Sequence, residues 1–238
     1  MVESPKLEGE AGFRCLALIE MANEESLETN QAHWREDDPF RSLRDHGARH
    51  YVRALALRSD QPLFRPRTYI GVAEYWTDDE AAALAIHARL RDRSWLKAHP
   101  VFRDARLTLL ANREHGFIGH LHDCPPDGIT AIFFNKRKED MSVEAYQHHW
   151  RDVHGPMVFG APGLARYLQL HRLPATYDGD DTALDGAAEM SWLDAAGQAT
   201  YSAAEDYQQK FRDDMPNLWD MRAGVRMYVR KEEVFHDR

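Results

Sequence analysis

Short runs of apolar residues, separated by polar segments, divide the first half of the chain into a regular series. Four of these runs are rich in branched or aromatic residues and have the length of strands. They lie at residues 13–20, 49–57, 69–76 and 103–111. Between them, segments that begin at Ser26 and at residue 78 have the periodic spacing of amphipathic helices. The pattern predicts the order strand, helix, strand, strand, helix, strand.

The second half of the chain follows the same series. Its four strand-like runs lie at residues 129–136, 165–173, 187–192 and 222–229. A helix is predicted to begin at Ser142, as the earlier one begins at Ser26, because a serine hydroxyl can accept a backbone amide of the first helical turn. A further helix over residues 194–211 is weakened by Gly197. The two halves therefore share one predicted order of elements.

The two halves also share a sequence phrase. Residues 26–38 (SLETNQAHWREDD) align with residues 142–154 (SVEAYQHHWRDVH) at an offset of 116, and six of the thirteen positions are identical. Two unrelated segments of this length would share about one residue. The offset also pairs Gly12 with Gly128, Tyr51 with Tyr167, Trp76 with Trp192, and Pro100 with Pro216. We infer a tandem duplication within the chain.

This organisation predicts an α+β fold built from two units. A flexible lead at residues 1–11 precedes a first ferredoxin-like β-α-β-β-α-β unit at 12–113, a linker occupies 114–127, and a second unit covers 128–238. One such unit leaves a face of its sheet uncovered, and two units can bury these faces against each other. We expect an intrachain pseudo-twofold α+β barrel, a pseudo-dimer that can still form a further homodimer.

The first helix of the second half carries a histidine among its apolar positions. At about 100° per residue, Val143, Tyr146, Trp150, Val153 and His154 share an arc of roughly 100°, and this face is predicted to turn toward the sheet. Burial disfavours a charged imidazole and a helix C-terminus favours it, so the pKa of His154 can lie near neutrality, where proton transfer is effective. The alternative is a hydrogen-bonded packing residue.

The first half differs at the polar members of this face. Asn30 stands where the second half has Tyr146, and Asp38 stands where it has His154, while the tryptophan is retained. A histidine needed only for packing should be present in both halves, so we expect the working site in the second half, in a cleft between its sheet and helices. The alternative is that Asn30 and Asp38 form a site with different chemistry.

Composition and charge narrow the classes of function. Of the 238 residues, 43% are hydrophobic and 29% are charged, the balance of a globular protein. The formal net charge is −9 and the basic residues form no tract, so nucleic acid is not an expected partner. No apolar run reaches the roughly 20 residues of a membrane span, so no membrane partner is expected. With no recognisable signal peptide, we expect a cytoplasmic protein in which Cys15 and Cys124 are free thiols.

Residues 136–158 (KRKEDMSVEAYQHHWRDVHGPMV), followed by PGLARYLQLHRL, resemble the EthD family of dimeric α+β barrel proteins. The family's motif places an aromatic residue, a tryptophan and a histidine at four-residue steps, here Tyr146, Trp150 and His154. It continues with Pro-Gly-Leu and an aromatic strand residue, here Tyr167. The resemblance covers about residues 128–229 and is much weaker over 12–113.

The resemblance implies an enzyme that moves protons on hydrophobic, often aromatic molecules. It implies that His154 is the general acid or base and that Tyr146 donates a hydrogen bond. We add His171 to the catalytic group, because strand alternation places it on the same side as Tyr167, from where it can meet His154. The substrate-binding residues expected are Trp150, Tyr167, Glu189, Val153 and Met157.

Other ionisable residues have structural interpretations. Glu74 and Glu189 occupy matched strand positions, and because both halves have one we favour glutamates paired with arginine. His33 and His149 also match, which suggests hydrogen bonds across the pseudo-twofold interface. Weaker candidates line a first-half cleft (His50, Tyr51 and Tyr75) or form a sparse metal-ligand set in the linker (His115, His120, His122 and Cys124). The linker spacing matches no zinc signature, so no metal site is predicted.

The leading hypothesis is a cofactor-independent enzyme acting on a small, hydrophobic, aromatic molecule by elimination, ring opening, cyclisation or isomerisation. No glycine-rich nucleotide motif is present, so no cofactor is expected. We lean toward a lyase or cyclase, because the predicted site offers an acid and a base but no redox group. One alternative is a cofactor-free monooxygenase, whose electron-rich substrate itself activates oxygen. Another is a non-catalytic protein that binds an aromatic ligand.

Overall fold

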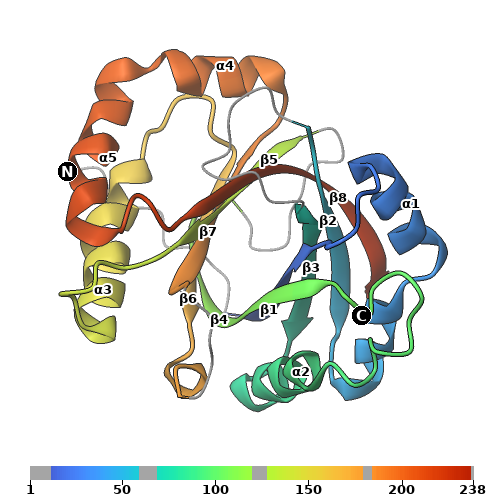
Figure 1. Ribbon diagram of the computed structural model, residues 1–238. Helices are drawn as coiled ribbons and strands as arrows, with labels where there is room; N and C mark the ends of the chain where they lie inside the picture. The colour runs from blue at the N-terminus through green and yellow to red at the C-terminus, as the bar shows by residue number, and fades with distance from the viewer. Residues whose placement is uncertain (1–11, 59–68, 120–127, 179–183, 237–238) are drawn as a thin grey trace.

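The computed structural model describes residues 12–58, 69–119, 128–178 and 184–236. Its strands close into one antiparallel barrel, and the helices lie outside the barrel on two sides (Figure 1). Around the barrel the strand order is β1-β3-β2-β8-β5-β7-β6-β4. The predicted α+β barrel is therefore confirmed. None of the helices in these four stretches is long and apolar enough to cross a membrane.

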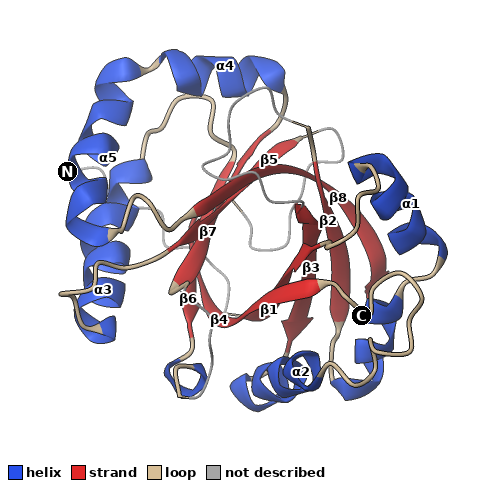
Figure 2. Ribbon diagram, viewed as in Figure 1, coloured by secondary structure: helices blue, strands red, loops and turns tan. Residues whose placement is uncertain are grey.

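Each half contains the predicted order of elements, as the colouring by secondary structure shows (Figure 2). The first half consists of β1 (Phe13–Glu20), α1 (Leu27–Glu36), the 3₁₀ helix η1 (Pro39–His46), β2 (His50–Ala56), β3 (Tyr69–Thr77), α2 (Glu80–Asp92) and β4 (Arg106–Ile118). The second half consists of β5 (Ile129–Asn135), α3 (Val143–His149), the π-helical turn η2 (Trp150–His154), the 3₁₀ helices η3 (Gly155–Val158) and η4 (Pro174–Thr176), β6 (Arg166–Arg172), β7 (Gly186–Trp192), α4 (Ala195–Ala203), α5 (Glu205–Leu218) and β8 (Val225–His236).

The two serines predicted to begin helices act as N-caps. The Ser26 hydroxyl accepts the amide of Thr29 at 3.1 Å, and the Ser142 hydroxyl accepts the amide of Ala145 at 3.2 Å. Each bond satisfies one backbone donor that the first helical turn leaves without an intrahelical partner. The local sequence signal thus fixes where both helices start.

Two strands are longer than predicted, and their extra residues close the barrel. β4 was expected to end at residue 111 and β8 at residue 229, but they run to Ile118 and His236. The first part of each strand pairs within its own half, and the last part pairs with the other half, β4 with β6 and β8 with β2. Residues 114–118, predicted to belong to the linker, are therefore part of a strand.

The helix predicted over residues 194–211 is instead two helices. α4 ends at Ala203, and α5 begins at Glu205 after Ala204, whose φ of −80° and ψ of 68° break the helical path. α5 also continues to Leu218, past Pro216. The tertiary contacts of this last turn hold it against the intrinsic cost of a proline inside a helix.

In the part of the chain that the structure describes, three hydrophobic clusters make up the core. One fills the barrel with residues from both halves, among them Leu16, Val72, Ile132 and Leu168. The other two lie outside the barrel, each between the strands of one half and the helices that cover them. Strand alternation explains this division, because successive side chains point into and out of the barrel.

The barrel interior also contains a buried ion cluster. The Arg14 guanidinium forms ion pairs with Glu74 and Glu189, both at 2.8 Å, and with Glu114. Lys231 adds contacts to the same two glutamates, at 3.0 Å to Glu74 and 2.7 Å to Glu189. The interpretation of Glu74 and Glu189 as glutamates paired with arginine agrees with this geometry. A buried carboxylate is tolerated when cations of this kind satisfy it.

Candidate functional site

A π-helical turn carries the candidate histidine. α3 passes into η2 at Trp150, and the amide of Gly155 closes the wide turn on the Trp150 carbonyl. Gly155 has no space for a side chain, since a Cβ there would lie 2.3 Å from Phe117 Cζ. Single π-helical turns inside α-helices occur often at functional sites. The close contact with β4 thus requires glycine at the point where this turn ends.

Three residues of the helix face predicted to meet the sheet are buried. Tyr146 and Trp150 have no exposed surface and His154 is 4% exposed. Val153 is 45% exposed, so its predicted place on this face is wrong. The π-helical turn explains the difference, because its wider winding rotates each residue less than an α-helix does. His154 stays on the buried face, and Val153 moves to the surface beside it.

An aspartate on α5 holds this histidine. Nδ1 of His154 lies 2.8 Å from one carboxylate oxygen of Asp214, and Nε2 of His149 lies 2.9 Å from the other. The Asn217 amide donates a further bond to Asp214 at 3.3 Å. Within the described stretches no hydrogen bond engages Nε2 of His154. The carboxylate therefore orients the imidazole through one nitrogen and leaves the other available.

The pKa values of this pair have opposing causes. Burial lowers the pKa of His154, and the hydrogen bond and charge of Asp214 only partly offset it, so the imidazole is neutral at pH 7. Burial acts to raise the pKa of Asp214, but hydrogen bonds from His154 and His149 outweigh it, and the net shift is downward. A neutral imidazole beside an ionised carboxylate is suited to act as a base.

Trp219, directly after α5, connects the members of the motif. Its ring lies edge-on to His154, with centroids 4.9 Å apart, and edge-on to Trp150 at 6.2 Å. Its indole N–H donates to the Tyr146 hydroxyl at 3.2 Å. Phe211 of α5 contacts the His154 ring from another side at 5.4 Å. The motif residues of α3 and η2 therefore form one aromatic cluster with the C-terminal part of α5.

The two motif tyrosines are protonated at neutral pH. Burial raises the pKa of Tyr146 well above its usual value and raises the pKa of Tyr167 to about 12. Among the described residues, the Tyr146 hydroxyl accepts a hydrogen bond from Trp219, and the Tyr167 hydroxyl accepts one from the Gln169 amide at 3.2 Å. Each therefore keeps its own O–H as a donor.

His171 lies near the cluster but is not a partner of His154. Its ring stacks on Trp150 with centroids 4.6 Å apart and 7° between planes, and its Nε2 lies 2.8 Å from the Gln169 side-chain oxygen. Burial lowers the pKa of His171 well below its usual value, and burial likewise lowers that of the adjacent His115 to about 4. The expectation that His171 meets His154 as a proton-transfer pair does not agree with this geometry.

The remaining predicted site residues lie in different places. Met157 is half-buried, and its carbonyl accepts the Tyr207 hydroxyl of α5. Glu189 lies inside the barrel, on the other face of the sheet from His154. His33 lies 3.6 Å from Glu25 in the first half, and His149 forms its hydrogen bond with Asp214 in the second half. These contacts differ from the prediction that the two histidines bond across the pseudo-twofold interface. The linker residues His120, His122 and Cys124 lie outside the described residues.

The first half has a different buried cluster at the matching position. Asp38 accepts hydrogen bonds from the Trp34 indole at 3.1 Å and from the Tyr51 hydroxyl at 3.0 Å. The Tyr51 ring stacks on Tyr75. Burial raises the pKa of Asp38 to about 6. The side chain of Asn30 is engaged by backbone and side-chain groups at the start of α1. The hydrogen bond between Tyr51 and Asp38 joins the end of the helix to β2, whereas the bonds of Asn30 hold the start of the helix.

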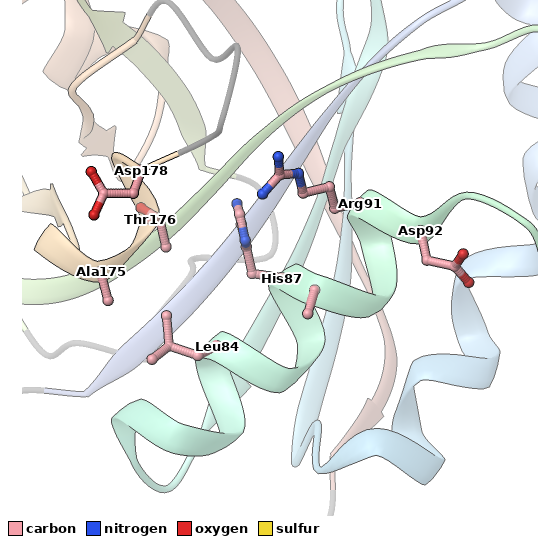
Figure 3. A pocket seen from close by; sticks show the side chains of 8 residues that line it. Leu84, His87, Arg91, Asp92, Ala175, Thr176 and Asp178 are labelled. Atoms are coloured by element: carbon pink, nitrogen blue, oxygen red, sulfur yellow. The ribbon is translucent and has the colours of Figure 1, made fainter.

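An open groove lies elsewhere, between α2 and η4 (Figure 3). Its volume is about 510 Å³. His87 and Arg91 reach it from α2, opposite Thr176 and Asp178. Of the site residues predicted from the sequence, none that the structure describes lines this groove.

Asp214 and Trp219 were missed in the sequence. Asp214 stands in helical register with Tyr207, Phe211 and Leu218, so a carboxylate on an apolar stripe was the available signal. It was lost because the predicted helix ended at residue 211. Trp219 had no comparable local signal, since its role depends on contacts with residues about 70 positions earlier.

Comparison with known proteins agrees with the fold. The chain is similar to an anthrone oxidase-like protein (9% identity, 96% of each chain covered, TM-score 0.62). It is also similar to a candidate monooxygenase from Fusobacterium nucleatum subsp. nucleatum (6% identity, 94% of each chain, TM-score 0.55). A chlorite dismutase mutant from Candidatus Nitrospira defluvii, in complex with cyanide, gives 11% identity over 96% of this chain and 95% of that one, with a TM-score of 0.51. At these identities the similarity extends to the fold alone.

Comparison with curated protein sequences found no match. The EthD domain family matches residues 138–221, a range that contains the aromatic–Trp–His motif, the Pro-Gly-Leu turn and Asp214. This range holds every side chain of the His154 cluster described above, from Tyr146 to Trp219. Residues 138–221 therefore match the EthD domain family, the family that the motif around His154 resembles.

Proposed function

We propose that the protein is a cofactor-independent enzyme that moves protons on a small hydrophobic, aromatic molecule at His154. The observation that carries this proposal is the hydrogen bond between Nδ1 of His154 and Asp214. A carboxylate bound to one imidazole nitrogen fixes the tautomer and directs the lone pair of the other nitrogen outward, as in hydrolytic triads. A packing histidine needs no such orientation.

The proposed chemistry follows from the protonation states. Neutral His154 takes a proton from the substrate at Nε2, and the Asp214 carboxylate stabilises the imidazolium that results. The imidazolium then returns the proton to a leaving group or to another atom of the product, which gives elimination, ring opening, cyclisation or isomerisation. The O–H groups of Tyr146 and Tyr167 donate to a carbonyl or phenolate oxygen on which negative charge develops.

Aromatic side chains suit the proposed substrate class. The indole rings of Trp150 and Trp219 stand at right angles to each other, and that of Trp219 lies edge-on to the imidazole of His154. An aromatic ring seated there would find offset or edge-on contacts of the kind these groups prefer. Because Val153 is exposed and Met157 is half-buried, and both are close to His154 in the sequence, we assign them to the rim of the proposed site. Glu189 is left out of the proposed site, because it faces the barrel interior.

The proposed site is closed, so substrate entry needs a movement. The side chain of His154 is 5% exposed. α4 contributes no buried residue, and α5 contributes only Asp214 and Leu218. Elements with so few buried contacts open at lower free energy than the strands of a barrel. We propose that α4 and α5 move together to admit the substrate.

The proposal of two duplicated units is supported by the strand order. β4-β1-β3-β2 and β8-β5-β7-β6 are contiguous sets of four strands, each forming half of the barrel in the same order. Together with the repeated phrase at an offset of 116, this supports two ferredoxin-like units from one ancestor, of which the second kept the acid–base residue. In the first unit, Asp38 accepts hydrogen bonds from Trp34 and Tyr51, which favours a structural role for this residue.

The test uses a panel of aromatic lactones, phenols and aryl ethers, with products followed by mass spectrometry. The proposal predicts turnover by the wild type, turnover by His148→Gln, and loss of turnover by His154→Gln. His148 is the matched control, because it lies on the same helix but is exposed and bonded only to Asp152 among the described residues.

Two alternatives give different results in the same assay. A cofactor-free monooxygenase consumes one oxygen molecule for each product formed, whereas the proposed proton transfer consumes none. Similarity to a candidate monooxygenase is the observation that keeps this alternative under test. A non-catalytic binding protein would bind the ligand, and neither the wild type nor the two variants would form product.

A further inference from the structure

Three potential metal ligands meet at the mouth of the barrel, on a seam between the two halves. His50 begins β2, while Glu233 and His236 lie near the end of β8. One donor atom of each lies within 4.8 Å of the donor atoms of the other two. Nε2 of His50 is 3.1 Å from Glu233, and Nδ1 of His236 is 3.8 Å from the same carboxylate oxygen.

A β-bulge brings these side chains to one face. In the pairing of β2 with β8, Tyr51 lies opposite Phe235 and Val52 lies opposite Glu233, so Val234 is an extra residue. In a regular strand, residues 233 and 236 would point to opposite faces because their separation is odd. The extra residue restores them to the same face, where His50 also points. Bulges that re-aim side chains are frequent beside functional sites.

The first ligand is held in position by its neighbours. The His50 ring lies between Trp76, with centroids 4.6 Å apart, and His236, with centroids 4.5 Å apart. The Arg14 guanidinium covers the other face of Trp76. His50 is 8% exposed, whereas Glu233 and His236 have side chains that are 60% and 47% exposed. One ligand is therefore rigid, and two can adjust around an ion.

We propose that His50, Glu233 and His236 bind a zinc ion. Two imidazoles and one carboxylate are a ligand set of zinc sites that keep a further position open to water. At zinc–ligand distances near 2.1 Å the donor atoms stand roughly 3–3.5 Å apart. The pair formed by His50 and Glu233 already meets this separation, and rotation of the exposed His236 side chain brings the third donor into range.

Charges near the site permit a cation. The layer beneath it contains Arg14, Arg166 and Lys231, matched by Glu74, Glu114 and Glu189 in direct ion pairs. This layer is neutral as a whole, and the Trp76 ring separates Arg14 from His50. The ion would join β2 of the first half to β8 of the second, so its binding free energy adds to the stability of the closed barrel.

The test is a metal titration of the full, tag-free chain after treatment with EDTA. Zinc is titrated by calorimetry, and cobalt(II) is used as the spectroscopic probe of coordination number. The site predicts one equivalent bound, a rise in Tm with zinc, and cobalt absorption typical of four or five ligands. Glu233→Gln and His236→Asn should each weaken binding at least tenfold and remove the Tm shift, with His50 left intact to preserve packing.

A matched control separates this site from other zinc-binding groups. Glu232→Gln changes the adjacent residue of β8, which bonds Arg35 outside the barrel, and should bind zinc as the wild type does. One equivalent that persists in both Glu233→Gln and His236→Asn would place the ion elsewhere and overturn the proposal. Absence of stoichiometric binding to the wild type would overturn it as well, and would leave Glu233 as a hydrogen-bonded partner of His50. Neither result bears on turnover at His154.

Discussion

His154 and Asp214 are 60 residues apart in the sequence, and their side chains meet at 2.8 Å. The bond joins η2 to α5 and gives an otherwise buried imidazole a fixed orientation. His149 binds the second oxygen of the same carboxylate. One aspartate therefore organises both histidines of this helix that face inward, and the proposed chemistry depends on it.

Replacement of Asp214 should change the titration of His154. The carboxylate raises the pKa of His154 against burial, so Asp214→Asn should lower this pKa further. The imidazole signals of His154, followed by NMR against pH, measure the shift. Asp213→Asn is the control, because Asp213 is exposed on the same helix. An unchanged His154 titration in Asp214→Asn would show that the pair is not coupled in solution.

Gly155→Ala should destabilise the protein by about 1–3 kcal/mol, the typical cost of overpacking. The added Cβ would lie 2.3 Å from Cζ of Phe117 and 3.0 Å from Nε2 of Gln169, so these packed side chains would have to shift. Urea unfolding measures the loss. Phe117→Leu removes the ring atom that clashes, so Gly155→Ala should cost less in that background. Equal costs in the two backgrounds would contradict the predicted contact.

Asp38 should make stability depend on pH in the first half. Its pKa rises from 3.8 to about 6 on folding, mainly through burial. The contribution of Asp38 to the free energy of unfolding is therefore fully present below about pH 3.8, and it is lost as the pH rises through about 6. Asp38→Asn should gain stability relative to the wild type between pH 4 and pH 7, measured by urea unfolding. Asp45→Asn, an exposed control in η1, should show a constant difference.

Glu189→Gln should cost about 3–5 kcal/mol, because it leaves buried cations without a compensating charge. Glu189 contacts Arg14, Arg166 and Lys231, whereas Glu74 contacts only the first and last of these among the described ion pairs. The loss should therefore be larger for Glu189→Gln than for Glu74→Gln in thermal or urea unfolding. A nearly neutral Glu189→Gln, accompanied by weakened ligand binding, would return this residue to the substrate-binding group.

Hydrogen exchange tests the proposed entry path. Amides of α4 and α5 should exchange faster than those of α2, on the order of tenfold. The reason is that α2 buries Ala83, Ile86, His87 and Leu90, whereas α4 buries none of its residues. A bound aromatic ligand should slow exchange in α5. Equal protection of α4, α5 and α2 would contradict opening by these helices.

Local patterns in the sequence predicted most of the fold. Strand β1 was predicted at its observed bounds, and Ser26 and Ser142 were correctly identified as helix caps. The ends of β4 and β8 were missed because they pair across the seam between the halves, a contact that no local window contains. The order of the elements can be predicted from the short-range periodicity of apolar residues. Closure of the barrel depends on pairing between strands that are far apart in the sequence.

The same division applies to the site. The motif residues Tyr146, Trp150 and His154 were found from helical spacing, and all three are buried on one face. Val153 was misplaced because a π-helical turn changes the spacing on which the prediction relied. Asp214 was missed because the predicted helix ended before it. Side chains that orient the histidine come from another helix, and only the folded chain brings them together.

The most direct test of the proposed site is a crystal structure of the protein soaked with a compound that it converts, or otherwise with the panel member that it binds most tightly. The proposed function predicts ligand density against Trp150 and Trp219, with an ionisable or oxygen-bearing atom within hydrogen-bonding distance of Nε2 of His154. Density in the groove between α2 and η4, with the His154 cluster still closed, would contradict it and make His154 a packing residue.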